Sequence, residues 1–568
     1  MGLDFIVWSS VLFILGIISI LGMWFIGMKS LVIELKVVSM SSSMIDLNML
    51  VDVLSMSFIS LVFLISSCVF FYSSSYMMQD EMGSRLMYLM IVFIFSMIFL
   101  IMFPSLLSVI LGWDGLGLSS FLLVVFFQNH RSLASGVLTA LSNRVGDGLL
   151  IVAMGVSLEK GIWWSVFELS GSVSVFIGLA SITKSAQVPF CAWLPAAMAA
   201  PTPVSSLVHS STLVTAGVYL LLRYSIVEEV SSFLMVVSSM TMILGGVSAL
   251  FEEDLKKVVA LSTLSQLGMM VFVISMGFKL ICLFHLYMHA LLKASLFLGV
   301  GSMIHCRREQ KILFMKGGVI DSPGSSSIIM ISCAALSGVP FLCGWFSKDL
   351  ILEVLLSNVS WLYSMIFLLG SLSSVIYSGR LTWMCVFVPI GSLPLSQSAD
   401  CRVMLISMMM LLMTLLLSGT FFFYWLGVES AIVLIEVDKM SSIFIIFGGL
   451  IFVHNWVFLR KGLGEDHNLT DMNMVKSLNF WQSFWSTMWF LPKLSSEVGM
   501  FSLMGSKLGM SYLEQGWFEY FGGKGVSELW SLILSTHQRG QSGGFNMTMN
   551  IMIMMFFLLM LCVGLSTF

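Results

Sequence analysis

Residues 171–223 read GSVSVFIGLASITKSAQVPFCAWLPAAMAAPTPVSSLVHSSTLVTAGVYLLLR and carry the clearest indication of the fold. Lys184 is its only formal charge before Arg223, and four of the chain's ten prolines follow it between positions 189 and 203. An ionisable side chain in the middle of a membrane costs at least about 2.5–3.5 kcal/mol, so it marks a candidate functional residue. Broken helices inside a membrane are tolerated only where they line a cavity or an ion path. The stretch therefore predicts a membrane span that is interrupted beside a functional lysine.

The whole chain has the composition of a membrane protein. Of its 568 residues, 58% are hydrophobic and 10% are charged, against about 25% charged in soluble domains. The apolar residues suffice for about 14–16 transmembrane helices of ~20 residues each, more than a soluble core could bury. The net charge of −3 and the lack of a basic run argue against nucleic acid as a partner.

The apolar runs are too long, and alternate too rarely, to be the strands of a membrane β-barrel. A helix satisfies its backbone hydrogen bonds internally, so we predict an all-α polytopic membrane protein. The spans are expected at residues 5–27, 49–72, 86–103, 105–127, 136–156, 172–190, 202–223, 232–251, 257–277, 280–304, 326–356, 360–379, 402–427, 430–457 and 547–567.

Residues 458–546 differ from the rest, being richer in Ser, Gly, Lys, Glu and Asn. Trp481, Trp485 and Trp489 follow one another at a spacing of four, which places them on one helical face. This pattern favours an amphipathic helix that lies laterally along the membrane surface. The alternative is a partly ordered loop, which the Gly522–Gly523 pair would allow.

Cofactor motifs are missing from the sequence. Its nine cysteines include no CxxC pair, and most lie inside apolar runs, where a thiol behaves as a small hydrophobe. No nucleotide-binding loop or flavin fingerprint is present either. We therefore expect no cofactor and no metal on this chain.

Further ionisable residues interrupt the apolar runs in the first third of the chain. Asp114 lies in a Gly-Trp-Asp-Gly tract inside the fourth span, and its short side chain cannot reach far towards water. Arg144 and Asp147 are three residues apart and can pair on one helical face. That pair could be a supporting ion pair or simply a neutralised internal pair. Lys184 could alternatively extend its amine to the membrane surface.

A titratable stripe is expected on the tenth span. His285, His289 and Lys293 are spaced four apart, so they project from one helical face. Two histidines at this spacing could bind zinc, but the glutamate of an HExxH motif is missing and no cysteine or carboxylate lies near. The remaining alternatives are core histidines bonded to neighbouring hydroxyls and a proton relay, since neutral imidazole can accept a proton on one nitrogen and release it from the other.

A second interrupted span is predicted around Lys348, which follows Gly338 and Pro340. The tract Val339–Trp345 is similar to Val188–Trp193 in the first interrupted span. Weak internal similarity of this kind is typical of transporters built from repeats. The lysine precedes one tract and follows the other, so coincidence is the alternative.

These motifs together resemble the signature of the antiporter-like membrane subunits of respiratory complex I. The resemblance covers roughly residues 50–390. It rests on Lys184–Gln187, Trp193–Met198, Pro201–Ser205 and His209–Thr212, with further matches at Gly112–Gly115, Asn143–Asp147, Asp254–Lys257, Ser262–Gly268, His289–Lys293 and Phe346–Asp349.

The resemblance implies two inverted five-helix antiporter-like repeats, each with a broken helix and a half-channel, joined by a hydrophilic axis. It divides the chain into N-terminal transmembrane helices over 1–80, the antiporter-like core over 81–390, additional transmembrane helices over 391–457, the lateral amphipathic segment over 458–546 and a transmembrane anchor over 547–568.

The resemblance also implies roles for single residues. Asp114 would be the acidic partner of Lys184, and protons would pass from Lys184 to Lys348 and then to Asp349. The intermediate residues of this path would be His209, His285, His289 and Lys293. Two positions depart from the family pattern: many relatives carry glutamate where Asp114 stands, and Glu-Gly where this chain has Ala199-Ala200.

The expected function is proton translocation within NADH:ubiquinone oxidoreductase. NADH, FMN, iron–sulfur clusters and ubiquinone would then bind to partner subunits. The expected partners are the adjacent antiporter-like subunits, accessory subunits and the lipid bilayer, in the mitochondrial inner membrane. The alternatives are a stand-alone cation/proton antiporter subunit and a structural anchor of the membrane arm, although an anchor has no need of isolated intramembrane lysines.

Overall fold

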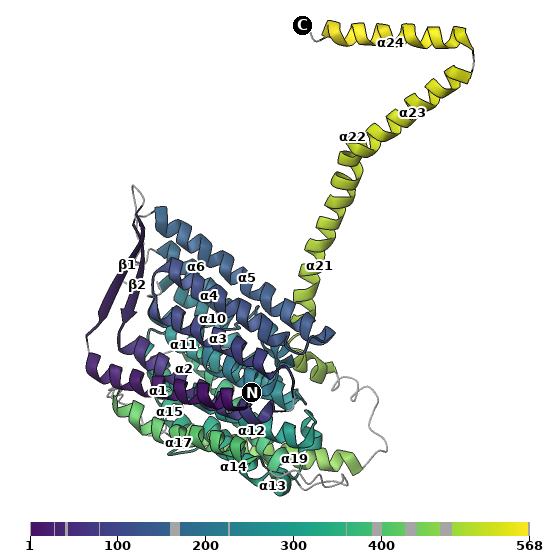
Figure 1. Cartoon of the computed structure of the whole chain (residues 1–568). Helices are drawn as coiled ribbons and strands as arrows, with labels where there is room; N and C mark the ends of the chain where they lie inside the picture. Colours follow the sequence, from purple (N-terminus) through teal and green to yellow (C-terminus); the bar gives the residue numbers. More distant parts are fainter. Residues whose placement is uncertain are drawn as a thin grey trace. The chain divides into compact units, whose positions relative to one another are not determined.

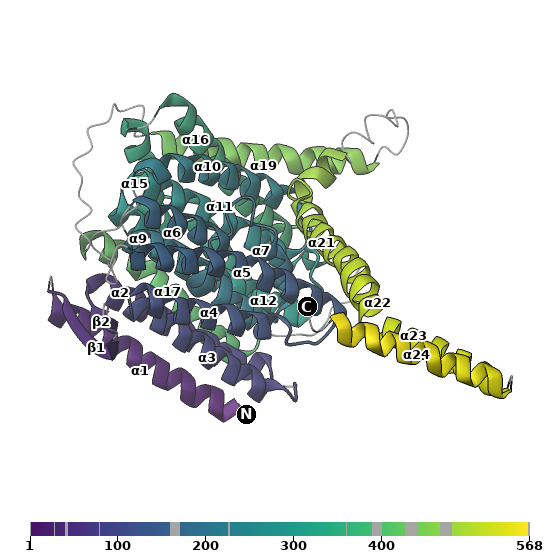
Figure 2. The same cartoon turned by 90° about the horizontal axis from the view of Figure 1, so that it is seen from above.

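The computed structural model describes residues 2–27, 29–39, 44–78, 80–159, 171–224, 228–358, 360–388, 400–425, 440–465, 480–542 and 544–565. These residues form two compact units, Met1–Leu491 and Pro492–Phe568 (Figure 1). All candidate residues lie in the first unit, which is a bundle of packed helices (Figure 2).

The helices of the first unit follow the expected spans closely. Within the described residues, eleven helices are long and apolar enough to cross a membrane, and four shorter apolar helices accompany them. The prediction of an all-α polytopic membrane protein is confirmed. The bundle contains α1 (Gly2–Ile26), α2 (Val53–Tyr76), α3 (Gly83–Met102), α4 (Leu106–Val124), α5 (His130–Glu159), α6 (Gly171–Lys184), α7 (Trp193–Ala196), η1 (Ala197–Ala199), α8 (Thr202–Leu207), η2 (Val208–Thr212), α9 (Leu213–Arg223), α10 (Glu228–Phe251), α11 (Leu255–Ser275), α12 (Lys279–Arg307), η3 (Ile312–Met315), α13 (Gly318–Asp321), α14 (Pro323–Ser337), α15 (Cys343–Asn358), α16 (Trp361–Thr382), η4 (Trp383–Phe387), α17 (Arg402–Trp425) and α19 (Ser441–Glu465).

A β-hairpin, which the sequence analysis did not predict, precedes the second span. Strand β1 (Leu31–Ser39) pairs antiparallel with β2 (Met44–Val51), with Leu31 opposite Val51. The span expected from residue 49 therefore begins later, at Val53. Asp52 sets this start, because its side chain accepts from the Ser55 N–H while Ser55 Oγ accepts from the Asp52 N–H.

Both interrupted spans end their first half in the same way. Helix α6 stops at Lys184, where Ala186 adopts a φ of 54° and the Gln187 N–H donates to Ile182 O. Helix α14 stops before Gly338, which has a φ of 90°, and the Val339 N–H donates to Ala334 O. Each is a helix end closed by a left-handed residue and a hydrogen bond back across five residues. The similar tracts thus lie at equivalent breaks.

Two expected boundaries are wrong for this reason. The run 172–190 is helical only to Lys184, and the run 326–356 is two helices, α14 and α15, rather than one span. Hydropathy alone places neither break, because apolar residues resume at Val188 after the first break and at Val339 after the second.

Helix α6 is held tightly between its neighbours at the lysine. A Cβ added at Gly217 of α9 would lie 2.7 Å from Ser181 O and 2.9 Å from the Ser185 backbone nitrogen. A Cβ at Gly146 of α5 would lie 2.2 Å from Thr183 Oγ1. Small residues permit such close backbone approach between membrane helices. These two glycines therefore fix the end of α6 that carries Lys184.

We expect Gly217→Ala to lower the thermal unfolding midpoint of the assembled protein. The added methyl group meets backbone atoms of α6, which cannot rotate away, and overpacking of this kind costs about 1–3 kcal/mol. Gly148→Ala on α5 is the matched control, since a Cβ there meets nothing within 4 Å. Equal midpoints for the two variants would contradict the close packing of α9 on α6.

The aromatic stripe of the segment 458–546 is shorter than expected. Residues 480–486 are helical, but Trp489 has a φ of 57° and lies beyond the helix. The rings of Trp485 and Trp489 still lie 5.8 Å apart. Helix α19 runs through the boundary expected at 457/458. Residues 466–479 lie outside the described part.

The second unit is helical over almost its whole described length. It contains most of α21 (Leu491–Gly509), η5 (Met510–Phe518), α22 (Glu519–Phe521), α23 (Gly523–Ser542) and α24 (Phe545–Leu565). A break occurs at Gly522, between α22 and α23. The alternative of a loop is therefore wrong for residues 491–542, while their position along the membrane stays a prediction.

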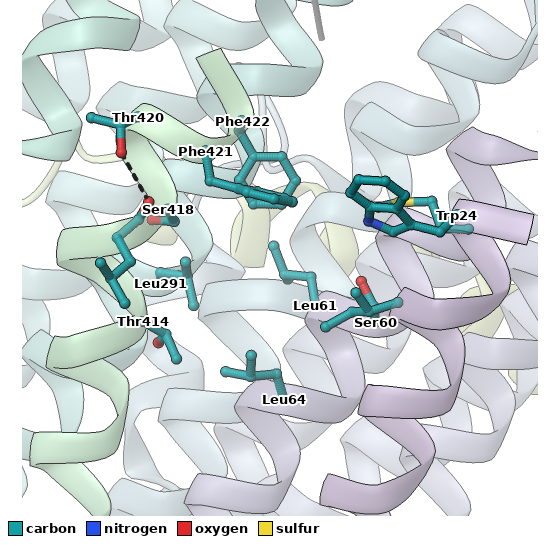
Figure 3. Close-up of a pocket in the computed structure, with 13 residues that line it drawn as sticks. Trp24, Ser60, Leu61, Leu64, Leu291, Thr414, Ser418, Thr420, Phe421 and Phe422 are labelled. Carbon is teal, nitrogen blue, oxygen red and sulfur yellow. Dashed lines mark hydrogen bonds between the residues drawn. The ribbon is translucent and has the colours of Figure 1, made fainter. Parts of the chain in front are cut away.

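An apolar cavity of about 840 Å³ lies between α1, α2, α12 and α17 (Figure 3). Its lining includes Trp24, Leu64, Leu291 and Phe421, and none of the ionisable candidates faces it. The candidate site therefore lies elsewhere, in the polar contacts between the helices.

Candidate functional site

Lys184 lies at the last turn of α6 and is completely buried. Its Nζ donates to Trp113 O at 2.7 Å and lies 3.7 Å from the centre of the Trp113 ring. An ammonium over an indole ring is stabilised by the ring's quadrupole. The alternative in which Lys184 reaches the membrane surface is therefore wrong.

Asp114 forms no close ion pair with Lys184, and its role as the acidic partner of that lysine stays a prediction. Its Oδ2 lies 3.5 Å from Arg144 Nη1, and the same nitrogen lies 3.1 Å from Asp147 Oδ2. Arg144 thus bridges two carboxylates from α4 and α5. Both of them interact electrostatically with Lys184. Lys184 therefore lies near a pair of carboxylates with an arginine between them.

His209 lies in η2, a π-helical turn between α8 and α9. Such turns inside α-helices occur frequently at functional sites. The buried ring lies 6.2 Å from that of Trp193, whose Nε1 donates to Thr183 O at 3.1 Å, next to Lys184. His209 Nδ1 has no hydrogen-bond partner among the described residues. The break in the first span thus brings His209 close to the end of α6.

The stripe on α12 meets polar groups of α11 and α15. Lys293 Nζ donates to Ser262 Oγ at 2.6 Å. His285 lies 3.0 Å from Ser347 Oγ through Nδ1 and 3.2 Å from Gln266 Oε1 through Nε2. His285 therefore has the contacts of a hydrogen-bonded core histidine.

His289 differs from His285 in its contacts. It is equally buried, and neither of its ring nitrogens has a hydrogen-bond partner among the described residues. Its ring centre lies 6.4 Å from that of His285. The two open nitrogens leave His289 available to take up or pass on a proton between Lys293 and His285.

Lys348 lies at the start of α15, after the second break. Its Nζ reaches back to donate to Leu336 O, in the last turn of α14, and to Ser374 Oγ of α16 at 2.9 Å. The carbonyl end of a helix carries a partial negative charge, which favours an ammonium there. Asp349, the next residue, interacts with the Ser442 side chain of α19.

The neutral partners of the lysines and histidines were missed by the sequence analysis. Ser262 and Gln266 are four residues apart on α11, and this spacing within a quoted motif was the available signal. Lys256 lies in the tract Asp254–Lys257. It is buried and donates to Ala200 O at 3.1 Å, at one of the positions that departs from the family pattern.

Two family models match the chain. One, described as NADH:quinone oxidoreductase/Mrp antiporter, TM, covers residues 104–376, and the other, described as NADH dehydrogenase subunit 5 C-terminus, covers 377–563. NADH-ubiquinone oxidoreductase chain 5 of Anopheles gambiae is 41% identical over 513 residues, or 87% of each chain. The Mytilus edulis protein of the same name is 40% identical over 505 residues, covering 84% of this chain and 85% of its own.

The chain belongs to the NADH-ubiquinone oxidoreductase chain 5 family. It is a multi-pass, proton-translocating membrane subunit of that oxidoreductase complex. The resemblance read from the motifs is thereby confirmed at the level of the family.

Solved structures show the same antiporter-like fold. The Mrp complex from Dietzia sp. DQ12-45-1b matches with a TM-score of 0.73 at 22% identity, over 94% of this chain and 59% of that chain. The membrane-bound sulfane sulfur reductase, an archaeal respiratory complex, matches with a TM-score of 0.66 at 16% identity, over 80% and 94% respectively. At these identities the likeness concerns the fold alone.

Proposed function

We propose that protons cross the mitochondrial inner membrane through this chain 5 subunit along one axis of buried residues. The axis runs from Lys184 to Lys348 and ends at Asp349, and its intermediate members are His209, His285, His289 and Lys293. Electron transfer on partner subunits drives the movement. Arg144, Asp114 and Asp147 control the first lysine.

One observation carries this proposal: the completely buried Lys184 and Lys293 and the half-buried Lys348 all have neutral partners. Lys184 donates to a carbonyl, Lys293 to a hydroxyl, and Lys348 to one of each. None of the three forms a close ion pair within the described residues. A fixed countercharge would hold each proton in place, whereas a serine hydroxyl can accept from an ammonium and also donate to a neutral amine.

The carboxylate pair supplies a means of switching Lys184. Removal from water favours the neutral amine, and nearby carboxylates favour the ammonium. Each tenfold change in the protonation equilibrium corresponds to about 1.4 kcal/mol. Moving one proton against 100 mV costs about 2.3 kcal/mol. A displacement of Asp147 and Asp114 that changes the protonation equilibrium of Lys184 about a hundredfold would therefore suffice to move one proton against 100 mV.

The redox reaction belongs to other subunits under this proposal. The axis contains lysine, histidine and carboxylate groups, which transfer protons and are not oxidised or reduced. NADH, FMN, iron–sulfur clusters and ubiquinone would bind to partner subunits. This chain would contribute to the enzyme by proton transfer alone.

Neighbouring membrane-arm subunits are expected to cover the Arg144 face. The Arg144 side chain is 55% exposed in the middle of α5, and that of Asp114 is 36% exposed. Charged side chains are costly against lipid and normally face other protein. We therefore propose that an adjacent antiporter-like subunit contacts this cluster, while accessory subunits and lipid cover the remaining apolar surface.

The test is NADH-driven proton uptake in inverted vesicles that contain the assembled complex. Lys293→Met should reduce the uptake and, through coupling, the NADH oxidation rate by about tenfold or more, since positioned proton-transfer groups contribute ~100-fold or more. Lys279→Met, at the exposed start of α12, is the matched control and should change neither rate. Unchanged uptake in Lys293→Met at equal complex content would contradict the axis. Sodium flux in place of proton uptake would favour a stand-alone cation/proton antiporter.

A further inference from the structure

A cluster of rings and hydroxyls lies where α2 and α12 end, outside the axis described above. The rings of Tyr72 and Tyr76 on α2 are stacked with their centres 5.7 Å apart. The Tyr76 ring lies 5.2 Å from that of His305 on α12. His305 is partly exposed, whereas Tyr72 is completely buried. The cluster thus leads inward from the surface of the bundle.

Thr202, the first residue of α8, lies at the inner end of this cluster. A Cβ added at Gly301 would lie 2.8 Å from Thr202 Oγ1 and 3.0 Å from the Tyr72 hydroxyl oxygen. Both oxygens therefore converge on the same point, which only a glycine leaves open. Within the described residues, neither the Tyr72 hydroxyl nor Thr202 Oγ1 has a hydrogen-bond partner.

These hydroxyl groups differ from most others in the bundle. The serine hydroxyls of α8 donate to carbonyls of their own helix, as Ser205 does to Thr202 O and Ser206 to Pro203 O. Tyr224 likewise donates to Pro104 O. Among the described residues, neither the Tyr72 hydroxyl nor Thr202 Oγ1 donates to a carbonyl. Both are buried, so they remain available for exchange with one another.

Helix α8 connects this cluster to the axis. Thr202 is the first residue of α8, and His209 lies in η2, the π-helical turn that continues it, so the two are seven residues or about 10 Å apart along the chain. Ser205 and Ser206 lie between them, but their hydroxyls donate to carbonyls of α8 and are not part of the route. His209 Nδ1, at the inner end, has no partner in the described part of the chain. From His305 inward, the hydroxyls of Tyr76, Tyr72 and Thr202 thus precede the open Nδ1 of His209.

We propose that this cluster is a proton-access route between the membrane surface and His209. The route runs through His305, Tyr76, Tyr72 and Thr202, and it rests on the proposed function of the axis. Each hydroxyl receives a proton on an oxygen lone pair and releases its own to the next acceptor, so only O–H and N–H bonds change. Charged groups lie at the outer end of the route: Asp80 interacts electrostatically with Tyr76, and Arg308 with His305. The Tyr72 phenol also interacts electrostatically with the thiols of Cys306 and Cys401.

The route is tested with isosteric variants in the assembled complex in proteoliposomes. Tyr72→Phe and Thr202→Val each remove one hydroxyl and keep the shape of the side chain. Both should reduce NADH-driven proton uptake about fivefold or more, given the size of positioned proton-transfer effects. The ratio of rates in H₂O and D₂O should rise, because proton transfer becomes rate-limiting.

Two control variants separate this role from a structural one. Thr202→Ser retains the hydroxyl and should retain the uptake. Tyr224→Phe removes a buried hydroxyl that only donates to a carbonyl, and it should retain both the uptake and the isotope ratio.

Full uptake and an unchanged isotope ratio in both Tyr72→Phe and Thr202→Val would overturn the route. A loss in Thr202→Ser equal to that in Thr202→Val would also overturn it, since the hydroxyl would then not matter. Lys184→Met is measured in the same preparation. If Lys184→Met loses uptake while the route variants do not, only the route is wrong. If Lys184→Met also pumps normally, the proposed axis itself fails.

Discussion

Replacing Lys348 with methionine is expected to reduce NADH-driven proton uptake by about tenfold or more, as for other positioned proton-transfer groups. Lys348 Nζ contacts Leu336 O and Ser374 Oγ, so it joins the end of α14 to α16 at the second break. Methionine keeps most of the apolar stem and removes the titratable amine. The fold should therefore persist while the axis loses its last lysine.

Lys348→Arg distinguishes proton transfer from a fixed charge. Arginine retains the positive charge but does not deprotonate in proteins. We expect it to pump as poorly as methionine, measured in inverted vesicles at matched complex content. Full activity of the arginine variant would make Lys348 a structural cation and would remove it from the axis.

Asp147→Asn is expected to reduce proton uptake about tenfold, and Asp114→Asn somewhat less. Asp147 lies 3.1 Å from Arg144 against 3.5 Å for Asp114, and its side chain is 10% exposed against 36%, so solvent screens its charge less. Losing about 1–2 kcal/mol of charge interaction at an effective dielectric constant of ~20 changes the protonation equilibrium by about tenfold.

Asp114→Glu is the matched comparison, because it keeps the charge that interacts with Arg144. Proton uptake and NADH oxidation should stay close to those of the unaltered complex. Asp114→Glu could instead fail while Asp114→Asn pumps normally. The importance of Asp114 would then come from its packing beside the glycines of α4 rather than from its charge. Equal uptake in Asp147→Asn and Asp114→Asn would contradict the order given by the geometry.

Most of the fold follows from the sequence because a bilayer leaves few solutions. Long apolar runs must be helices, and isolated charges within them must face protein, so the spans and the candidate lysines could both be predicted. The hairpin of β1 and β2 could not be predicted from apolar runs, because strand β1 carries Glu34 and Lys36 among apolar residues. The break between α14 and α15 was placed inside a span because hydropathy does not register a left-handed Gly338.

The residues that could serve as proton carriers follow from the sequence, since composition and the cost of burying charge single them out. Their contacts depend on how the helices pack. Lys184 donates to Trp113 O, Arg144 joins two carboxylates, and the hydroxyls of Thr202 and Tyr72, 130 residues apart in the chain, converge at Gly301. These contacts join different helices, and their partners are mostly carbonyls and hydroxyls. Such neutral groups occur along every helix, so neither charge nor periodicity could identify the few that helix packing brings within reach.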